Sequence, residues 1–308
     1  MWRIVLLSLL GVALAPDQAG AQSYPSRPVR VVVPASPGGG SDLTARILAP
    51  GLGAELGQPF VVENRVTSGG IVGTQQVAES PPDGHTLLGT FDTFATNPYL
   101  YKNLRWDPLR DFAPVMQICR YPQVLVVHPS LGVKTVREFV ALAKERGASL
   151  NYGSAGPASS SRLAYELFKQ VAGIETMPIH YRGGGPAMQD LVSGQVQVML
   201  TGKLVALGVS TAARSPSWPG VPAIAETYPG FESTSWTAIF APAETPAPIV
   251  VRLHGALTKV LADPQVRERL ESQSCEVVGG TPAALTELVR AEQAKWGPLI
   301  RQMHITVD

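Results

Sequence analysis

Short apolar runs alternate with amphipathic segments through most of this chain. Runs of Val, Leu and Ile, short and rich in β-branched residues, predict strands at residues 29–33, 60–63, 85–90 and 124–128. Apolar residues at helical spacing predict helices at residues 42–56, 70–79 and 135–146. This alternation is typical of an α/β protein with a parallel, doubly wound sheet.

The second half of the chain continues the pattern. Strands are expected at residues 150–152, 193–200 and 204–209, and helices at residues 159–168, 247–262, 263–271 and 283–303. Residues 91–108, rich in polar and aromatic side chains, are expected to form a loop. Because no repeat or flexible linker divides the chain, we expect two lobes joined by crossing strands. Their predicted bounds are 27–123 with 242–308, and 124–241.

Two turns rich in Gly and Ser each end a predicted strand and open a predicted helix. The first contains Gly38, Gly39, Gly40, Ser41 and Asp42, and the second contains Ser154, Ser159, Ser160 and Ser161. The N–H groups of a helix N-terminus lack intrahelical partners and favour an anion such as a carboxylate. Ligands of doubly wound sheets bind beyond the carboxyl ends of strands, where both turns fall. We therefore predict that the turns bind one small anion between two lobes.

Four further residues are candidates for the ligand site. Phe91, Asp92 and Thr93 follow the third strand, where a ligand-facing turn belongs. Asp92 would repel a carboxylate, which favours a role as a backbone cap or as a partner for an amine on the ligand. Arg182 is the best-placed cation for a carboxylate, with a solvated loop arginine as the alternative.

Composition and motifs exclude several other classes. The chain has 308 residues, enough for about two domains, with 45% hydrophobic residues and a formal net charge of +1, so no broad basic surface for nucleic acid is expected. The glycines of the first turn match neither a dinucleotide fingerprint nor a P-loop, and no His or Cys spacing suggests a metal. We expect no cofactor. Tyr152-Gly-Ser-Ala-Gly156 resembles a nucleophile elbow with its first Gly replaced, which leaves a serine hydrolase acting through Ser154 as an alternative.

The N-terminus has the three parts of a secretory signal. Arg3 precedes the short apolar residues 4–15, and Ala19-Gly-Ala21 predicts cleavage after Ala21. The alternative is a buried N-terminal helix. Cys119 and Cys275 could pair in an oxidising compartment, or they could be two small buried hydrophobic residues.

An ordered set of segments over nearly the whole mature chain resembles a known family, the periplasmic solute receptors of tripartite tricarboxylate transporters, or Bug receptors. The segments are Tyr24-Pro-Ser-Arg-Pro-Val-Arg30, Pro37-Gly-Gly-Gly-Ser-Asp42, Val62-Glu-Asn-Arg65, Pro82-Asp-Gly-His-Thr-Leu87, Asn97-Pro-Tyr-Leu-Tyr101, Asp111-Phe-Ala-Pro114, Tyr152-Gly-Ser-Ala-Gly156, Gly194-Gln-Val-Gln-Val-Met199, Arg214-Ser-Pro216 and Val278-Gly-Gly-Thr-Pro282.

The resemblance implies a two-lobed periplasmic-binding-protein (Venus-flytrap) fold without enzymatic activity. It implies a periplasmic monomer that closes on a small organic acid and delivers it to membrane permease subunits. It also implies that backbone N–H groups, hydroxyls and waters at residues 38–42 and 154–161 hold the carboxylate.

The chain departs from the family pattern in three places. Val66-Thr-Ser-Gly-Gly70 and Pro157-Ala158 differ from the usual turns, and about a dozen residues are missing after Leu200. Parallel neighbouring strands need a crossover of about a dozen residues. Residues 196–200 and 204–209 are therefore expected to form a hairpin, to run on as one bent strand, or to lie in different sheets. These departures leave a repurposed sensor that binds a protein partner as a further alternative.

Overall fold

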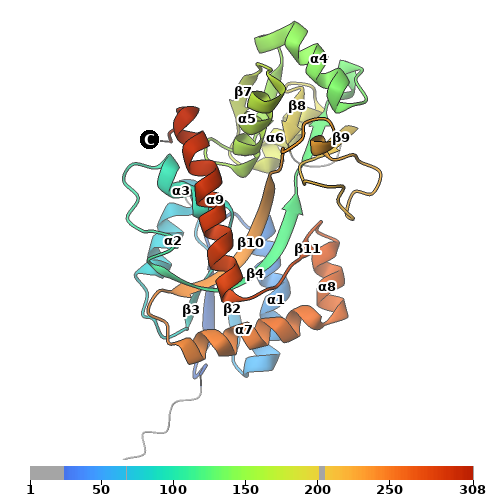
Figure 1. The fold of residues 1–308 in the computed structure, drawn as a ribbon. Coiled ribbons are helices and arrows are strands. Elements are labelled where there is room, and N and C mark those ends of the chain that lie inside the picture. The colour runs from blue at the N-terminus through green and yellow to red at the C-terminus, as the bar shows by residue number, and fades with distance from the viewer. Residues whose placement is uncertain (1–23, 67, 201–204, 308) are drawn as a thin grey trace, which may run out of the picture.

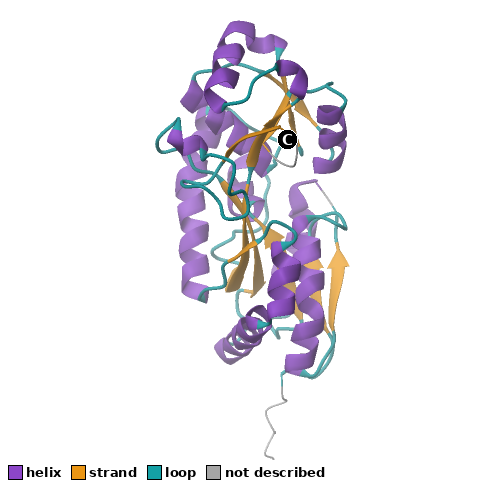
Figure 2. Cartoon of the chain, turned by 90° about the vertical axis from the view of Figure 1, so that its right-hand side faces the viewer, coloured by secondary structure: helices purple, strands orange, loops and turns teal. Residues whose placement is uncertain are grey.

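The computed structural model describes residues 24–66, 68–200 and 205–307, and these form two lobes, each built on its own sheet (Figure 1). The predicted signal peptide and cleavage site lie outside the described residues. The predicted two-lobed α/β fold is confirmed. Figure 2 shows the molecule from the side, with helices on both sides of the lower sheet.

The first lobe has a six-stranded sheet in the order β11-β4-β10-β3-β1-β2, with β1, β2 and β3 parallel and β4, β10 and β11 in antiparallel pairs. The strands are β1 (Val29–Val33), β2 (Phe60–Asn64), β3 (Thr86–Phe91), β4 (Phe112–Pro122), β10 (Thr234–Pro242) and β11 (Glu276–Val277). The helices are α1 (Gly40–Leu56), α2 (Ile71–Ala78), α3 (Thr93–Leu100), α7 (Ala247–Ala262), α8 (Pro264–Glu271) and α9 (Pro282–Gln302).

Helices cover both faces of this sheet, which explains why the central strands β1 and β3 are almost fully buried, whereas the edge strand β2 is partly exposed. Val31 and Val33 pack in one cluster with residues of α1, α7 and α8. Val32, which points to the other face, packs with residues of α2, α3 and α9. Successive residues of one strand therefore enter two separate cores.

The second lobe has a five-stranded sheet in the order β7-β6-β8-β5-β9. Its strands are β5 (Val124–Val127), β6 (Asn151–Ser154), β7 (Met177–His180), β8 (Val198–Leu200) and β9 (Val205–Val209). Its helices are α4 (Val136–Arg146), α5 (Ser160–Ala172) and α6 (Gly184–Val192). Helices α4 and α5 pack on one face of the sheet and α6 packs on the other.

The chain crosses between the lobes at β4 and β10, which lie side by side and antiparallel: in Figure 1 β4 runs up toward the upper lobe and β10 runs back down into the lower one. Gln123 alone separates β4 from β5, so the sheet changes at the first predicted boundary. The second predicted boundary lies between residues 241 and 242, at the end of β10. All of β10 belongs to the first sheet, so the sheet changes before Thr234.

Three local predictions were wrong. The expected loop at residues 91–108 contains α3, which Phe94, Ala95 and Leu100 anchor by burial in spite of Pro98. The strand expected at residues 193–200 is limited to β8, because the turn that ends α6 occupies its first part.

The third concerns β8 and β9. They lie in one sheet but are not neighbours, since β5 lies between them and pairs antiparallel with both. None of the three expected arrangements applies. Residues 201–204, where we expect the missing segment, lie outside the described residues.

A disulfide joins Cys119 in β4 to Cys275, next to β11, with the two Cα atoms 5.2 Å apart. Both residues are buried in the first core. The sequence had left pairing and simple burial open, and the structure decides for pairing. In the described part of the chain, no helix is both long and apolar enough to cross a bilayer.

Replacing both cysteines, Cys119→Ala with Cys275→Ala, is expected to destabilise the protein by about 2–4 kcal/mol, because the bond closes a long loop in the unfolded chain. The two residues are 156 positions apart. Urea unfolding with and without reductant measures the loss. Reductant should lower the stability of the parent protein and leave the double variant unchanged, and free thiols in the unreduced native protein would contradict the assignment.

Candidate functional site

A cleft of about 590 Å³ lies between the lobes. The first lobe contributes the end of β1, the loop from β2 to α2, and residues beside α3. The second lobe contributes the turn from β6 to α5 and the loop after β7. The lining residues that carry the argument below are Val66, Phe91, Tyr101, Ser160, Tyr181 and Arg182.

The second-lobe wall is the N-terminus of α5. Ser159 is the N-cap, accepting a hydrogen bond from the N–H of Arg162 while its hydroxyl donates to the carbonyl of Gly156 at 2.7 Å. The Ser161 hydroxyl accepts from the N–H of Ala155 at 3.1 Å. These hydroxyls fix the turn, so that the first N–H groups of α5 remain for a ligand at the cleft. Of the predicted residues in this turn, Ser159 and Ser160 line the cleft.

Ser154 lies behind this wall. It is fully buried, and its hydroxyl lies 2.7 Å from Nδ1 of His180. Burial lowers the pKa of His180, and the positive charge of Arg162 in α5 lowers it further. A Ser–His contact is part of hydrolase chemistry, but a nucleophile with no exposed surface cannot reach a substrate carbonyl. The contact between Ser154 and His180 instead holds the ends of β6 and β7 together.

Arg182 lines the cleft from the loop after β7. Its side chain is exposed, and it makes no hydrogen bond or ion pair with any residue that the structure describes. The neighbouring Tyr181 donates its hydroxyl to Asp190 at 2.6 Å. Burial, followed by this hydrogen bond, raises the pKa of Tyr181 to about 12. The wall thus holds one cation without a partner beside a helix N-terminus.

The first-lobe wall is built around a close contact of glycine with tyrosine. Gly69, with φ of 62°, lies against the ring of Tyr101, and a Cβ at Gly69 would lie 2.9 Å from Tyr101 Cζ. The Asn97 side chain donates to the carbonyl of Gly69 at 2.9 Å. Gly70 then opens α2. Phe91 and Thr93, both predicted site residues, complete this side.

The first predicted turn lies partly beside the cleft. Gly39, Gly40 and Ser41 line a neighbouring hollow of about 240 Å³, which shares Phe91 with the cleft. Gly38 and Asp42 line neither space. Although burial raises the pKa of Asp42, hydrogen bonds from Arg46, Gly38 and Asn64 outweigh it and keep the pKa below its usual value. Asp42 therefore holds the turn together.

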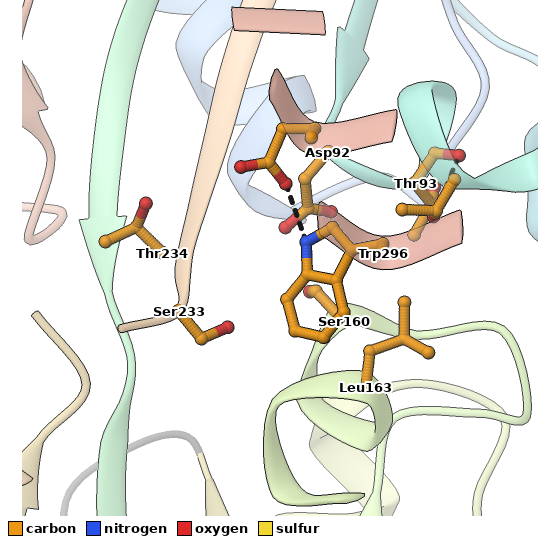
Figure 3. A pocket seen from close by; sticks show the side chains of 9 residues that line it. Asp92, Thr93, Ser160, Leu163, Ser233, Thr234 and Trp296 are labelled. Carbon is orange, nitrogen blue, oxygen red and sulfur yellow. Dashed lines mark hydrogen bonds between the residues drawn. The ribbon is translucent and has the colours of Figure 1, made fainter. Parts of the chain in front are cut away.

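Asp92 lies in a small hollow next to the cleft floor, between α3, α5 and α9 (Figure 3). Thr93 and Ser160 line both spaces. Asp92 is 4% exposed, and neither carboxylate oxygen has a hydrogen-bond partner among the described residues. Burial raises the pKa of Asp92 to about 7, and the nearby Glu292 carboxylate adds to the rise. Glu292 accepts a hydrogen bond from the Trp296 indole at 2.8 Å, and burial raises its pKa as well.

Among the described residues, no group of three or more His, Cys, Asp and Glu side chains could hold a metal ion. The features that converge on the cleft are an unpartnered arginine, a helix N-terminus and hydroxyl groups. These bind anions; they do not activate a nucleophile or a metal-bound water.

The family model described as "Tripartite tricarboxylate transporter family receptor" matches residues 44–305. The chain belongs to this receptor family. A protein from the tcbD-tcbE intergenic region of a Pseudomonas species is 36% identical to this receptor, over 97% of this chain and 95% of that protein. The resemblance stated from the sequence is thereby confirmed, and its relatives are binding proteins.

Solved structures agree with the family assignment. The periplasmic binding protein BugD has a TM-score of 0.82 to this receptor at 32% identity, covering 92% of this chain and 100% of its own. An R. palustris protein solved with adipate has a TM-score of 0.85 at 33% identity, with the same coverages. MatC from Rhodopseudomonas palustris, with bound malate, has a TM-score of 0.80 at 31% identity, covering 90% of this chain and 100% of its own.

Sequence reasoning missed part of the cleft wall of this receptor. Val66, Gly69 and Tyr101 line the cleft but were not among the predicted site residues. Tyr101 closes the segment Asn97-Pro-Tyr-Leu-Tyr101, which carried part of the family resemblance, and that segment was the available signal. Its place in the wall depends on α3, the helix that the sequence pattern did not predict.

Asp92→Asn is expected to stabilise the receptor at pH 8 by up to about 4 kcal/mol and to have little effect near pH 4. The pKa of Asp92 rises from 3.8 to about 7 in the folded protein. The folded state therefore binds the proton more tightly, and stability falls as the pH rises from about 4 to about 7. Urea unfolding of both proteins at several pH values measures the difference, and a gain that does not change with pH would contradict this account.

Gly69→Ala is expected to lose more stability than Gly132→Ala. Both glycines have left-handed backbone, with φ of 62° and 68°, which costs an alanine about 1–2 kcal/mol. A Cβ at Gly132 meets nothing within 4 Å, whereas at Gly69 it collides with Tyr101. The collision should add about 1–3 kcal/mol. Equal losses in urea unfolding would show that Tyr101 moves away without cost.

Proposed function

We propose that this chain is an exported, periplasmic receptor that captures a small organic acid between its lobes and delivers it to membrane permease subunits of a tripartite tricarboxylate transporter. It acts as a monomer, after cleavage of its signal peptide at Ala21. The observation that carries the proposal is the unpartnered Arg182 beside the N-terminus of α5, in a cleft that both lobes line.

The proposed binding residues divide into two groups. Phe91, Thr93, Ser159, Ser160 and Arg182 lie on the cleft itself and contact the ligand. Gly39, Gly40 and Ser41 contact it, or its waters, from the neighbouring hollow when the lobes close.

The remaining predicted residues support the site without lining the cleft. The N–H of Gly38 donates a hydrogen bond to the Asp42 carboxylate, and this contact shapes the first turn. Ser154 and Ser161 shape the second turn. Asp92 lies below the cleft floor.

Two observations support a carboxylate as the ligand. Among the described residues that line the cleft there is no Asp or Glu, so no carboxylate of the described wall contacts and repels a bound anion. Related proteins of this fold have been solved with adipate and with malate.

Arg182→Gln is expected to weaken carboxylate binding by at least about tenfold, because a charge-assisted hydrogen bond contributes roughly 1.5–3 kcal/mol. Arg269→Gln makes the same charge change on an exposed arginine of α8, away from the cleft, and should leave binding unchanged. Isothermal titration with a panel of mono-, di- and tricarboxylates measures the affinities.

A panel in which no carboxylate binds or raises the melting temperature would overturn the receptor function. It would favour a sensor that binds a protein partner. Equal affinities in Arg182→Gln and Arg269→Gln would leave carboxylate binding in place and remove Arg182 from the site.

A further inference from the structure

The charge on the cleft wall is small. Arg182 is the single charged side chain among the described lining residues. A helix N-terminus adds the equivalent of about half a positive charge, as at α5. On the cleft wall these two groups balance about one carboxylate, and the N-terminus of α1, at Gly39, Gly40 and Ser41, lies in the neighbouring hollow. A second or third carboxylate would have to lose its water without a cation in return, which costs free energy.

Acidic groups lie directly behind the cleft floor. Thr93 and Ser160, which line the cleft, also line the hollow that contains Asp92 and Glu292. A second anionic group placed against this floor would approach two carboxyl groups through a thin wall of short side chains. Where Asp92 is ionised, above its pKa of about 7, the floor repels a second anionic group and favours a neutral part of the ligand.

Apart from the hydroxyls of Ser36, Thr93, Ser159 and Ser160, the rest of the described wall is apolar and partly aromatic. Phe91 and Tyr101 line it from the first lobe and Tyr181 from the second. The Tyr181 hydroxyl donates to Asp190 and is therefore already engaged within the protein. Aromatic rings lining a pocket favour a flat apolar partner through stacked or edge-to-face contact.

Val66 also favours a ligand with an apolar body. It lines the cleft, and 57% of its surface is exposed. An exposed valine alone is ordinary. On the wall of a binding cleft, beside the rings, it is apolar surface that a ligand's body would remove from water.

We propose that the ligand carries a single carboxylate on a flat apolar body of aromatic size. The carboxylate lies at Arg182 and the N-terminus of α5, and the body lies against Phe91, Tyr101 and Val66. This inference rests on the proposed receptor function and narrows the class of acid that the receptor takes.

The first test compares probes on the parent protein. Phenylacetate is expected to bind at least about tenfold more tightly than malate, adipate or citrate, since it buries a ring and brings one charge. Acetate, which has the carboxylate without the ring, should bind too weakly to measure. If malate, adipate or citrate binds more tightly than phenylacetate, the inference is overturned and the carboxylate receptor stands. If none of these acids binds, both the inference about the ligand and the proposed receptor function are overturned.

The second test locates the apolar body. Val66→Ser should weaken phenylacetate binding by about fivefold to tenfold, because the apolar contact is lost. Val251→Ser is the matched control, since Val251 is 70% exposed on α7 and does not line the cleft. Both positions are exposed, so neither variant should unfold. Equal phenylacetate affinities in the two variants would contradict the proposed position of the ligand.

Discussion

The arrangement of the two lobes depends on one small set of hydrogen bonds at the crossing strands. Ser210, which has no exposed surface, follows β9 and joins both crossings. Its hydroxyl accepts from the N–H of Gln123, between β4 and β5, and donates to the carbonyl of Ser233, just before β10. Its N–H and carbonyl bond to the backbone of the same two residues, each at 2.8 Å. A buried polar group without a partner is costly, so this junction fixes how β4, β9 and β10 meet.

A second contact between the lobes is apolar and limits how they can move. Leu100 at the end of α3 and Trp296 and Ile300 on α9 pack with Ala158 and Leu163 of the second lobe. Figure 1 shows α9 running along the first lobe and up to the second. Because this cluster is buried, opening the lobes widely would expose it to water. Closure on a ligand is therefore expected to be a rotation about the crossing strands that keeps this cluster packed.

The sequence predicted local features well where the signal was itself local. The run of apolar residues at β1 and the serines before α5 predicted a strand and a helix start close to where they lie. Helix α3, within the predicted loop at residues 91–108, and the pairing of β8 and β9 with β5 depend on contacts far apart in the sequence, and periodicity does not encode them. The same limit explains why Gly69 and Tyr101 were missed, since only the packed fold brings them together at the cleft.

Charge is distributed unevenly around the cleft, and this has a consequence for how any ligand lies in it. The second-lobe wall offers Arg182 and the N-terminus of α5, whereas Asp92 and Glu292 lie behind the floor. Where these acids are ionised, which for Asp92 requires a pH above about 7, the potential runs from positive at one wall to negative below the floor. We therefore expect an anion that enters to be oriented with its negative end toward the second lobe. On this proposal Asp92 and Glu292, which cost stability when ionised, would influence which ligand is bound without contacting it.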